Sequence, residues 1–421
     1  MQDFPRMLQS YESDCDDIVS GSSDEEDWES YADVREGFIA QVTLSYPRRL
    51  HASHRSFPLA PEKRCVTSSE LSPYQKRCHR ILKTKPGKVP KLMGTFYTRK
   101  KYVLHAANLK LYLKLGMKLK KVHKVLTFEE SNFLKKYIDF CTRMRGQATS
   151  DFDKKMFKLM SNSNFGKFIE NSSRYLDMKL VFNPKDAKFW VSSPRYHSYR
   201  VISDKLVAIF LNRRRNVIRQ AYAIGFSILD LSKEFMYKSY YQDIKPKLGP
   251  ECKVLFSDTD SLFMECEENN AFEKLRSILD TSNFPPDHPL YRKDRKAKLG
   301  YFKSEVGSMN IVKFVGLRSK CYAFQTEQGD EDIKCKGLSK AYKKQISINH
   351  FERCLAKIQT VTATQRLLRT KNNSIEIIRM KKQVLSSYDD KHYLLRCARH
   401  SVPFNSSYIA KNYDFCTECG I

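Results

Sequence analysis

The sequence predicts an α+β protein, and three stretches carry that prediction. In "VLFSDTDSLFMECE", residues 254–267, two apolar runs flank Asp258 and Asp260, which is the pattern of a β-hairpin with a polar turn. The stretch "GFIAQVTLSYP", from Gly37, has the character of another strand. Residues 221–240 instead carry an apolar stripe at helical spacing. The chain is therefore expected to contain both strands and helices, and it shows no internal repeat.

The remaining elements are expected in the following order. Residues 101–128 alternate apolar stretches with lysines, which predicts a strand, a short helix and another strand. From Thr127 to Phe168 the spacing of apolar residues is helical. A second helix is predicted over Ala221–Tyr240, and Pro246 and Gly249 are expected to end it. Its stripe consists of Ile224, Ile228, Leu231 and Phe235. The lysine-rich C-terminal stretch carries no secondary-structure assignment.

Charge is the strongest bulk signal. The 421 residues include 75 Lys and Arg against 47 Asp and Glu, giving a net charge of +28. The acidic residues are concentrated in Met1–Glu36, which reads as a disordered leader, so the rest of the chain is even more basic. Such a surface attracts a polyanion, and nucleic acid is the first candidate. The alternative is a soluble basic protein that binds RNA without specificity.

The sequence argues against a membrane or secreted protein. It contains neither a run of eighteen apolar residues nor an N-terminal signal-peptide core, so no membrane partner is expected. The twelve cysteines are scattered, which favours reduced thiols in an intracellular protein. Within the cell we expect a nuclear location.

Asp258 and Asp260 are the candidate catalytic and metal-binding residues. Residues two apart project to the same side of an extended chain, so both carboxylates are expected to face one site. Hard cations such as Mg²⁺ bind carboxylate oxygens and keep open positions for phosphate. Most Asp-x-Asp tripeptides are surface turns, but the apolar runs on both sides distinguish this one.

Two further stretches fit a bound nucleotide or nucleic acid. In "KLMSNSNFGKF", Lys158 and Asn162 share a helix face, and Phe165 and Gly166 offer an aromatic ring and space beside it. The alternative for this stretch is an amphipathic helix that ends in a glycine cap. In "GLRSKCY", Lys320 and Tyr322 are expected to share one side of a strand, and taken alone this is only a basic strand.

Taken together, the three motifs resemble those of family B DNA polymerases, most closely the protein-primed branch of Polinton/Maverick elements and related viruses. Three other stretches share the resemblance, which spans Gly37 to Ile409: "LHASHRSFPLAPEK" (50–63), "AIGFSILDLSKEFMY" (223–237) and "LSSYDDKHYLL" (385–395). It implies a right-hand fold with a palm built on an antiparallel sheet, helical fingers and a small thumb. The implied partners are DNA template-primer and deoxynucleoside triphosphates, with a terminal protein as a possible primer.

The resemblance also implies a role for each motif. Lys158 would contact the phosphates of the incoming nucleotide, with Asn162, Phe165 and Gly166 beside it, and Phe165 would pack near the nascent base pair in place of the usual Tyr. Asp260 would be the principal metal ligand, supported by Asp258. Lys320 and Tyr322 would hold the primer end. Two Mg²⁺ or Mn²⁺ ions would activate the primer 3′-hydroxyl and stabilise the leaving pyrophosphate.

The chain departs from this family at its front. The upstream motif Asp-x-x-Ser-Leu-Tyr-Pro, which supplies a third carboxylate, is missing. Its nearest look-alike, "QVTLSYP", has the neutral Gln41 in the aspartate's place, and the exonuclease region is absent too. The chain therefore reads as an N-terminally truncated polymerase, expected to polymerise poorly or not at all alone. A separate N-terminal half could restore the missing ligand, and a non-catalytic nucleic-acid-binding protein is the competing interpretation.

The expected division of the chain follows the family. Residues 1–36 form the acidic leader, and 37–145 a palm-associated region between the first two family motifs. Residues 146–250 hold the fingers helices and an insertion. Residues 251–330 form the palm with the metal-binding hairpin, and 331–421 the thumb and C-terminal tail.

One further group of residues has the composition of a zinc site. Cys397, His400, Cys416 and Cys419 have ligand types and spacing that suit tetrahedral Zn²⁺. The first pair lies in a stretch that resembles the thumb, where no metal is implied, and the second pair abuts the chain end. We therefore disfavour zinc binding from the sequence.

Overall fold

The computed structural model describes residues 35–215, 220–296, 298–371, 374–412 and 414–420. The expected mixture of helices and strands is confirmed in these residues, and nearly all the strand pairs are antiparallel. The acidic leader lies outside the described residues except for its last two, which begin the first strand. In the part of the chain that is described, no helix has the length and apolar character to cross a membrane.

The first sheet has the strand order β4-β1-β5, and both neighbours run antiparallel to the central strand. Its strands and the helix that packs on them are β1 (Arg35–Ser45), β4 (Arg99–His105), β5 (Lys118–Glu130) and α3 (Ala106–Lys114). Phe38, Ala40, Val42 and Leu44 alternate along β1 and are all buried, because one face of the strand looks into the core. The strand, helix and strand expected in residues 101–128 are confirmed.

Three long helices follow this sheet along the chain. They are α4 (Lys135–Gln147), α5 (Asp151–Phe168) and α7 (Tyr222–Lys238). The helical assignment from Thr127 was wrong at its start, because residues up to Glu130 pair with β1. The helix predicted at 221–240 is confirmed as α7, but it continues through the π-helical turn η3 (Ser239–Ile244) into α8 (Lys245–Leu248). Pro246 therefore lies inside α8, and Gly249, at φ +88°, follows the helix end.

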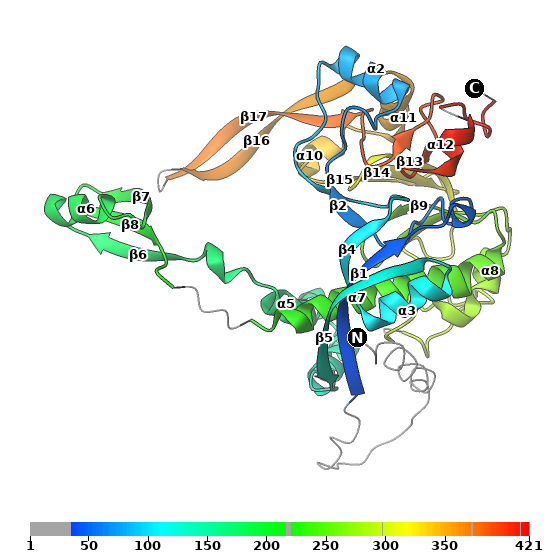
Figure 1. The fold of residues 1–421 in the computed structure, drawn as a ribbon, viewed down its shortest axis with the longest axis horizontal. Coiled ribbons are helices and arrows are strands. Elements are labelled where there is room, and N and C mark those ends of the chain that lie inside the picture. The colour runs from blue at the N-terminus through cyan, green and yellow to red at the C-terminus, as the bar shows by residue number, and fades with distance from the viewer. Residues whose placement is uncertain (1–34, 216–219, 297, 372–373, 413, 421) are drawn as a thin grey trace, which may run out of the picture.

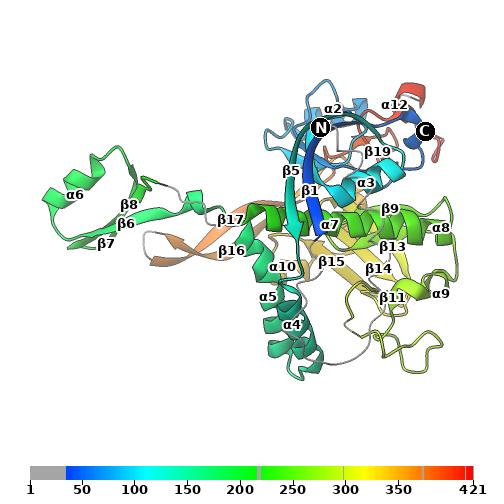
Figure 2. The same ribbon diagram turned by 60° about the horizontal axis from the view of Figure 1, so that its bottom comes forward.

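A small sheet with the order β6-β8-β7 forms an arm that projects from the body (Figure 1). Its elements, with the short turn before it, are η2 (Ser172–Arg174), β6 (Leu176–Val181), α6 (Pro184–Val191), β7 (Tyr196–Ser203) and β8 (Leu206–Asn212). A separate long hairpin, β16 (Thr360–Lys371) with β17 (Ser374–Ser386), projects from the same side of the body in both ribbon views (Figures 1 and 2). The arm has its own small core of Val181, Ile209 and Leu211.

The body next to these projections holds a hairpin and a second three-stranded sheet. The hairpin is β9 (Lys253–Ser257) with β10 (Leu262–Glu265), and the sheet has the order β13-β14-β15. The sheet strands are β13 (Ile311–Arg318), β14 (Cys321–Thr326) and β15 (Glu331–Cys335), followed by α10 (Lys340–Lys343) and α11 (Ile348–Ala356). Helix α11 packs on β13, β14 and β17, with Phe351 fully buried between them. Four short elements follow the hairpin: α9 (Ala271–Lys274), η4 (Arg276–Ile278), β11 (Leu279–Asp280) and β12 (Phe302–Lys303).

The C-terminal tail returns to the segment that follows β1. The short elements concerned are η1 (Arg48–Leu50), β2 (Glu62–Arg64), α2 (Pro73–Leu82), β3 (Lys91–Met93), β18 (Tyr393–Leu394), β19 (Ser401–Val402) and α12 (Ser407–Asn412). The amide of Phe96 donates to the carbonyl of Phe404 at 2.9 Å, and Tyr393 and Val402 share a core cluster with Met93. The two parts of the chain are therefore packed together although about three hundred residues separate them.

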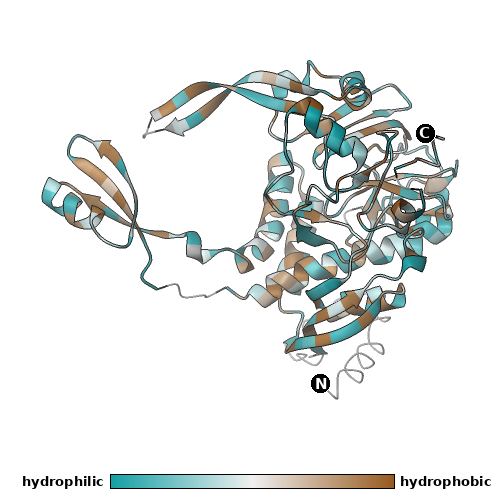
Figure 3. Ribbon diagram, turned by 45° about the horizontal axis from the view of Figure 1, so that its top comes forward, coloured by the Kyte–Doolittle hydropathy of each residue, from teal (hydrophilic) through white to brown (hydrophobic). Residues whose placement is uncertain are grey.

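Hydropathy follows this architecture. The large clusters of buried apolar residues lie in the body, whereas polar and apolar residues alternate along the strands of the two projections (Figure 3). Leu368, Ile375 and Ile377 of the long hairpin are about 70% exposed (72, 76 and 69%). That hairpin therefore owes its position to its base, where Ala363, Val384 and Leu385 are buried.

Candidate active site

The turn between β9 and β10 carries the two aspartates. Phe263 pairs with Phe256 across the strands, and the Asp258 amide donates to the Ser261 carbonyl at 3.1 Å. Within the turn the Asp260 amide donates to the Asp258 carbonyl at 2.7 Å, while Thr259 adopts φ +63°. A hydrogen bond across one residue of positive φ is a strained γ-type turn, and it is unusual for a β-branched residue.

The hairpin is confirmed, but the two aspartates do not lie on an extended chain. Asp258 is half-buried and Asp260 is exposed, since the tight turn at Thr259 separates them. A tight turn, and not alternation along an extended strand, therefore positions the two carboxylates.

Lys320 meets the hairpin from another part of the chain. Its Nζ lies 3.2 Å from Oδ2 of Asp258, which joins the second and third sequence motifs. Lys320 occupies the two-residue turn between β13 and β14, at φ +59°, and its carbonyl accepts from the amide of Lys336 at 3.0 Å. Lys320 and Tyr322 were expected on one strand, but only Tyr322 lies within β14.

Aromatic packing holds these elements together. The ring centroid of Tyr322 lies 4.6 Å from that of Phe256 and 5.2 Å from that of Phe263. Phe314 of β13 packs on the same group, 5.2 Å from Phe263. These contacts fix the hairpin on the β13-β14-β15 sheet, so the approach of Lys320 to Asp258 follows from the packing of apolar side chains.

Charged groups that the sequence analysis missed surround Tyr322. Lys334 is its partner across the β14–β15 pair, and Lys334 Nζ lies 2.6 Å from Oδ2 of Asp332. Burial raises the pKa of Tyr322, Lys334 opposes this, and the carboxylates of Asp332, Asp258 and Glu305 add to the rise. The hydrogen bond to Asp332 raises the pKa of Lys334. The register of β15 on β14 places Lys334 opposite Tyr322, and the sequence shows no signal for that register.

The nucleotide-binding candidates lie on α5, as predicted. Lys158 and Asn162 are exposed one turn apart, and Phe165 and Gly166 are half-buried. The helix passes through Gly166 and reaches Phe168, so a glycine cap is not what ends it. A Cβ at Gly166 would meet no atom of the described chain within 4 Å, which leaves open space beside the helix.

Helix α5 is held by its contact with α7. A Cβ placed on Gly225 of α7 would lie 2.2 Å from Cγ2 of Ile169 and 3.4 Å from the carbonyl oxygen of Phe165. The close approach therefore requires glycine at this position. Among the described residues, Lys320 forms an ion pair with Asp258, whereas Lys158 and Asn162 lie exposed on the surface of α5.

The aspartate pair suits Mg²⁺ in the chemistry of its donors but not in their number. Carboxylate oxygens are the ligands that Mg²⁺ prefers. Within the described ranges, however, no third His, Cys, Asp or Glu side chain joins Asp258 and Asp260 in a group with metal-ligand spacing. Gln41 lies in β1, where it pairs with Val103 and Lys124. The two aspartates therefore supply carboxylates of the kind that a divalent ion prefers, but they are not a complete ligand set and cannot hold two ions by themselves.

The cysteine and histidine group is brought together by the fold. One ligand atom from each of Cys397, His400, Cys416 and Cys419 lies within 4.8 Å of all the others. Zinc was disfavoured because the first pair lies in a stretch that resembles the thumb and because the second pair abuts the chain end, with little to order it. The structure contradicts the second reason, since Cys416 is fully buried in a core cluster with Val402 and Phe404.

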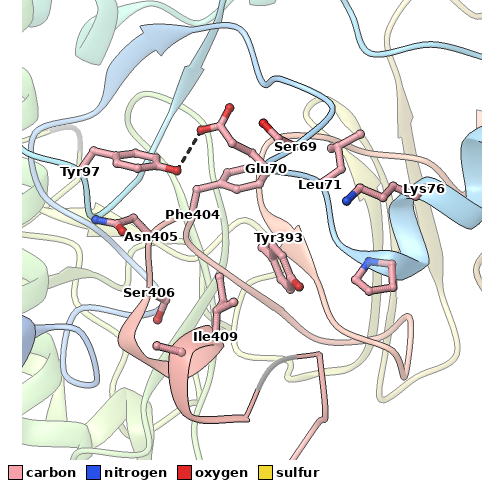
Figure 4. A pocket seen from close by; sticks show the side chains of 12 residues that line it. Ser69, Glu70, Leu71, Lys76, Tyr97, Tyr393, Phe404, Asn405, Ser406 and Ile409 are labelled. Carbon is pink, nitrogen blue, oxygen red and sulfur yellow. Dashed lines mark hydrogen bonds between the residues drawn. The ribbon is translucent and has the colours of Figure 1, made fainter.

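A hollow of about 380 Å³ lies away from the aspartates (Figure 4). Residues of α2, β18 and α12 and their neighbours line it, and Tyr97 Oη donates to Oε1 of Glu70 at 2.9 Å at its edge. It shares no residue with the β9–β10 turn or with Lys320. The candidate residues therefore lie outside this hollow.

Comparison with known proteins gives distant similarity only. No known protein family and no curated protein matches the sequence. Among solved structures, the chain is similar to Phi29 DNA polymerase complexed with primer-template DNA in a post-translocation binary complex. The TM-score is 0.47 at 14% identity, over 85% of this chain and 52% of that one.

The ternary complex of Phi29 DNA polymerase with primer-template DNA and incoming nucleotide substrates gives a TM-score of 0.44 at 15% identity, over 83% of this chain and 58% of that one. The chain thus spans little more than half the length of the polymerase that it matches. With TM-scores below 0.5 this likeness carries no argument about activity, which has to be argued from the side chains of the site.

Proposed function

We propose that this chain is the fingers, palm-hairpin and thumb part of a family B DNA-directed DNA polymerase. It would act on a DNA primer-template and deoxynucleoside triphosphates. In this proposal α4 and α5 belong to the fingers, the β9–β10 hairpin and the β13-β14-β15 sheet to the palm, and the β16–β17 hairpin to the thumb. The arm with β6, β7 and β8 is an insertion after the fingers helices.

The observation that carries the proposal is the ion pair between Lys320 and Asp258. The two residues belong to separate motifs of the resemblance, sixty-two positions apart, and their charged atoms lie 3.2 Å apart. In a basic protein unrelated to polymerases, contact between the Asp-Thr-Asp turn and the Lys-x-Tyr turn would not be expected. A primer terminus needs both a metal-binding carboxylate and a phosphate-binding cation within a few ångströms of each other.

The side chains have distinct roles in this proposal. Lys320 places an ammonium group beside the hairpin, and Lys334 lies opposite Tyr322 on β15. Both would bind primer phosphates. Tyr322 is fixed by Phe256 and Phe263, so its ring is a rigid wall for the primer end. Lys158 would bind the phosphates of the incoming nucleotide. A divalent ion on Asp260 and Asp258 would supply charge stabilisation at the reacting phosphate.

The long hairpin supports binding of a polyanion. Arg366 and Arg379 lie directly opposite each other on β16 and β17, and both are exposed. Like charges in opposite positions destabilise a strand pair, and an anion lying against them removes that cost. DNA held between the thumb and the body would supply such an anion.

Other parts of the proposal rest on the resemblance alone. These are an origin in a Polinton/Maverick element or related virus, a nuclear location, and priming by a terminal protein. The third carboxylate would come from a separate N-terminal half, because the described residues bring none to Asp258 and Asp260. That same observation favours a second candidate function, a non-catalytic DNA-binding protein derived from a polymerase.

Primer extension by the purified chain tests the proposal. The assay contains a labelled primer-template, four deoxynucleotides and Mg²⁺ or Mn²⁺. The variants are Asp260→Ala and, as a matched control, Asp287→Ala, which removes an exposed aspartate from a loop outside the site. Salt-dependent DNA binding is measured on the same samples.

The outcomes separate the two candidate functions. Extension that Asp260→Ala abolishes and Asp287→Ala preserves supports the polymerase. Absence of extension with salt-sensitive binding intact supports the non-catalytic binder, unless an added N-terminal half restores activity. Absence of both binding and extension refutes both functions.

A further inference from the structure

Four side chains meet where the chain end packs on the turn after β18. Nδ1 of His400 lies 3.6 Å from Sγ of Cys397 and 3.3 Å from each Sγ of Cys416 and Cys419. All four atoms lie within 4.8 Å of one another. Tetrahedral Zn²⁺, with bonds of about 2.3 Å to sulfur and about 2.0 Å to nitrogen, requires ligand atoms roughly 3.5–3.8 Å apart.

Hydrogen bonding alone does not account for this arrangement. A neutral imidazole has one lone pair, so Nδ1 accepts from one thiol, yet three sulfurs surround it. A disulfide would pair two of the cysteines and leave the third beside the ring. A metal ion at the centre satisfies all four atoms together.

The second nitrogen of the imidazole is also held. His400 Nε2 lies 3.1 Å from Oε2 of Glu418, and such a carboxylate contact fixes the ring so that Nδ1 faces the sulfurs. Glu418 is itself held by Arg55 Nη2 at 2.9 Å and by Lys253 Nζ at 3.4 Å. Histidine ligands of metal ions in proteins nearly always have a partner of this kind.

The backbone around both pairs has the form of a metal-binding turn. The amide of His400 donates to Sγ of Cys397 at 3.3 Å, and Ala398 inside that turn adopts φ +63°. In the second pair the Cys419 amide donates to the Cys416 carbonyl at 3.3 Å, and Gly420 follows at φ +66°. Both turns therefore present their ligand atoms to one point.

We propose that Cys397, His400, Cys416 and Cys419 bind one structural Zn²⁺ ion. Three thiolates and an imidazole are soft ligands that select Zn²⁺ over Mg²⁺. The four ligands complete a tetrahedron, and Cys416 is fully buried, so no position is open for a substrate. The ion is structural and separate from any ion at the aspartates, and the proposal does not depend on polymerase activity.

The site would fasten the C-terminal tail to the strand that carries the aspartate turn. Glu418 links the histidine ligand to Lys253, the first residue of β9. The amide of Arg396 donates to the carbonyl of Asp414 at 2.9 Å, which adds a direct tie between the two ligand pairs. Loss of the metal is therefore expected to release the tail from β9.

Metal analysis of the full chain tests this. The protein is dialysed extensively and its zinc content is measured by mass spectrometry, with the Cys416→Ser/Cys419→Ser double variant beside it. Cys65→Ser is the matched control, because it removes an exposed thiol outside the group. We expect one tightly bound zinc per chain in the wild type and the control, and none in the double variant. Absence of zinc in the wild type, or equal zinc in the double variant, would overturn the proposal.

Two measurements keep the test decisive if the double variant does not fold. Cobalt exchanged into the wild type should give the visible absorption bands of a tetrahedral thiolate site, and a spectrum of octahedral cobalt refutes the proposal. The thiols of the denatured, chelated protein should number twelve, as in the sequence. Two fewer, with the disulfide mapped by peptide mass spectrometry to two of Cys397, Cys416 and Cys419, would show that a disulfide occupies the site instead. Cys321 and Cys335, whose Sγ atoms lie 3.6 Å apart, are the other pair that mapping must distinguish. His400→Cys keeps four ligands and should retain zinc.

Discussion

Lys320 and Asp258 form an ion pair at 3.2 Å although 48% and 36% of their side-chain surfaces remain open. An exposed pair contributes about 0–1 kcal/mol to stability. The pair is therefore too weak to be the reason why the β9–β10 and β13–β14 turns meet, and the aromatic contacts of Tyr322 perform that task. Both charges remain available for ligands.

The first prediction follows from this exposure. Lys320→Ala should leave the melting temperature nearly unchanged while it weakens primer-template binding and any extension. Lys313→Ala is the matched control, since Lys313 forms a similarly exposed pair with Glu352 at 2.8 Å on β13. Fluorescence anisotropy and thermal melts measure the two effects. Equal losses of DNA affinity in both variants would show that Lys320 has no special role.

The second prediction concerns the long hairpin. The double substitution Arg366→Ser/Arg379→Ser should weaken DNA binding. Because about two phosphate contacts are lost, the slope of log K against log salt should become less steep by roughly 2. Stability should rise slightly or stay constant, because two opposed like charges are lost. The control removes two exposed lysines of the loop after α2, Lys85 and Lys88. A similar fall in slope there would mean that net charge alone is responsible.

The third prediction concerns the seating of α5 on α7. Gly225→Ala places a Cβ 2.2 Å from Cγ2 of Ile169, and overpacking of this kind costs about 1–3 kcal/mol. Adding Ile169→Ala removes the overlapping atom and should restore most of the stability. Gly166→Ala is the control within α5, where open space should make the change neutral or stabilising by about 0.5–1 kcal/mol. Urea unfolding measures the free energy of unfolding of the wild type and the three variants. Equal stabilities of Gly225→Ala and the wild type would contradict the prediction.

Local patterns predicted the elements that local residues determine. The apolar stripe of α7 and the two runs around Asp258 and Asp260 gave a helix and a hairpin that the structure confirms. The error at Thr127 arose because pairing with β1 extends β5 to Glu130, and strand register is a property of the fold. The γ-type turn at Thr259 has no signature in residue types, since a β-branched residue is disfavoured there.

The long-range contacts were out of reach for a different reason. The ion pair of Lys320 depends on four aromatic rings that meet across two sheets, and Lys334 joins the site only through the register of β15. The cysteine and histidine group has residue types and spacing that suit zinc, but a pair of cysteines close to the chain end is not expected to be ordered. The contact between Phe96 and Phe404, which orders the tail, cannot be read from spacing.

The fourth prediction concerns the carboxylate behind the histidine ligand. Glu418→Gln keeps the size of the side chain but weakens its hold on His400 Nε2, and losses of this kind lower metal affinity about 10–100-fold. Competition with a zinc chelator measures the change. Glu267→Gln, an exposed glutamate on the hairpin side, should have no effect. An unchanged zinc affinity in Glu418→Gln would contradict the role given to this carboxylate.

The fifth prediction concerns acid stability and rests on a buried histidine. His54 is 4% exposed, and its Nδ1 lies 2.8 Å from Oη of Tyr46, which also accepts from the amide of Leu59. Burial lowers the pKa of His54 to about 4, helped by the charges of Lys245 and His51. An ordinary histidine has a pKa near 6.5, so between pH 6.5 and 4 the unfolded chain binds more protons than the folded one.

Stability should therefore fall as the pH falls through that window. The free energy of unfolding should be unaffected by His54 above pH 6.5, where the histidine is neutral in both states. Between pH 6.5 and 4, proton binding to His54 in the unfolded chain should lower it by at most about 3 kcal/mol. His54→Gln has no proton to bind in this range, so its free energy of unfolding should depend less steeply on pH. Urea unfolding at several pH values from 7 to 4 measures both slopes. His197→Gln, which removes an exposed histidine of β7, is the matched control. Parallel curves for wild type and His54→Gln would show that His54 is protonated in the folded protein as readily as in the unfolded one.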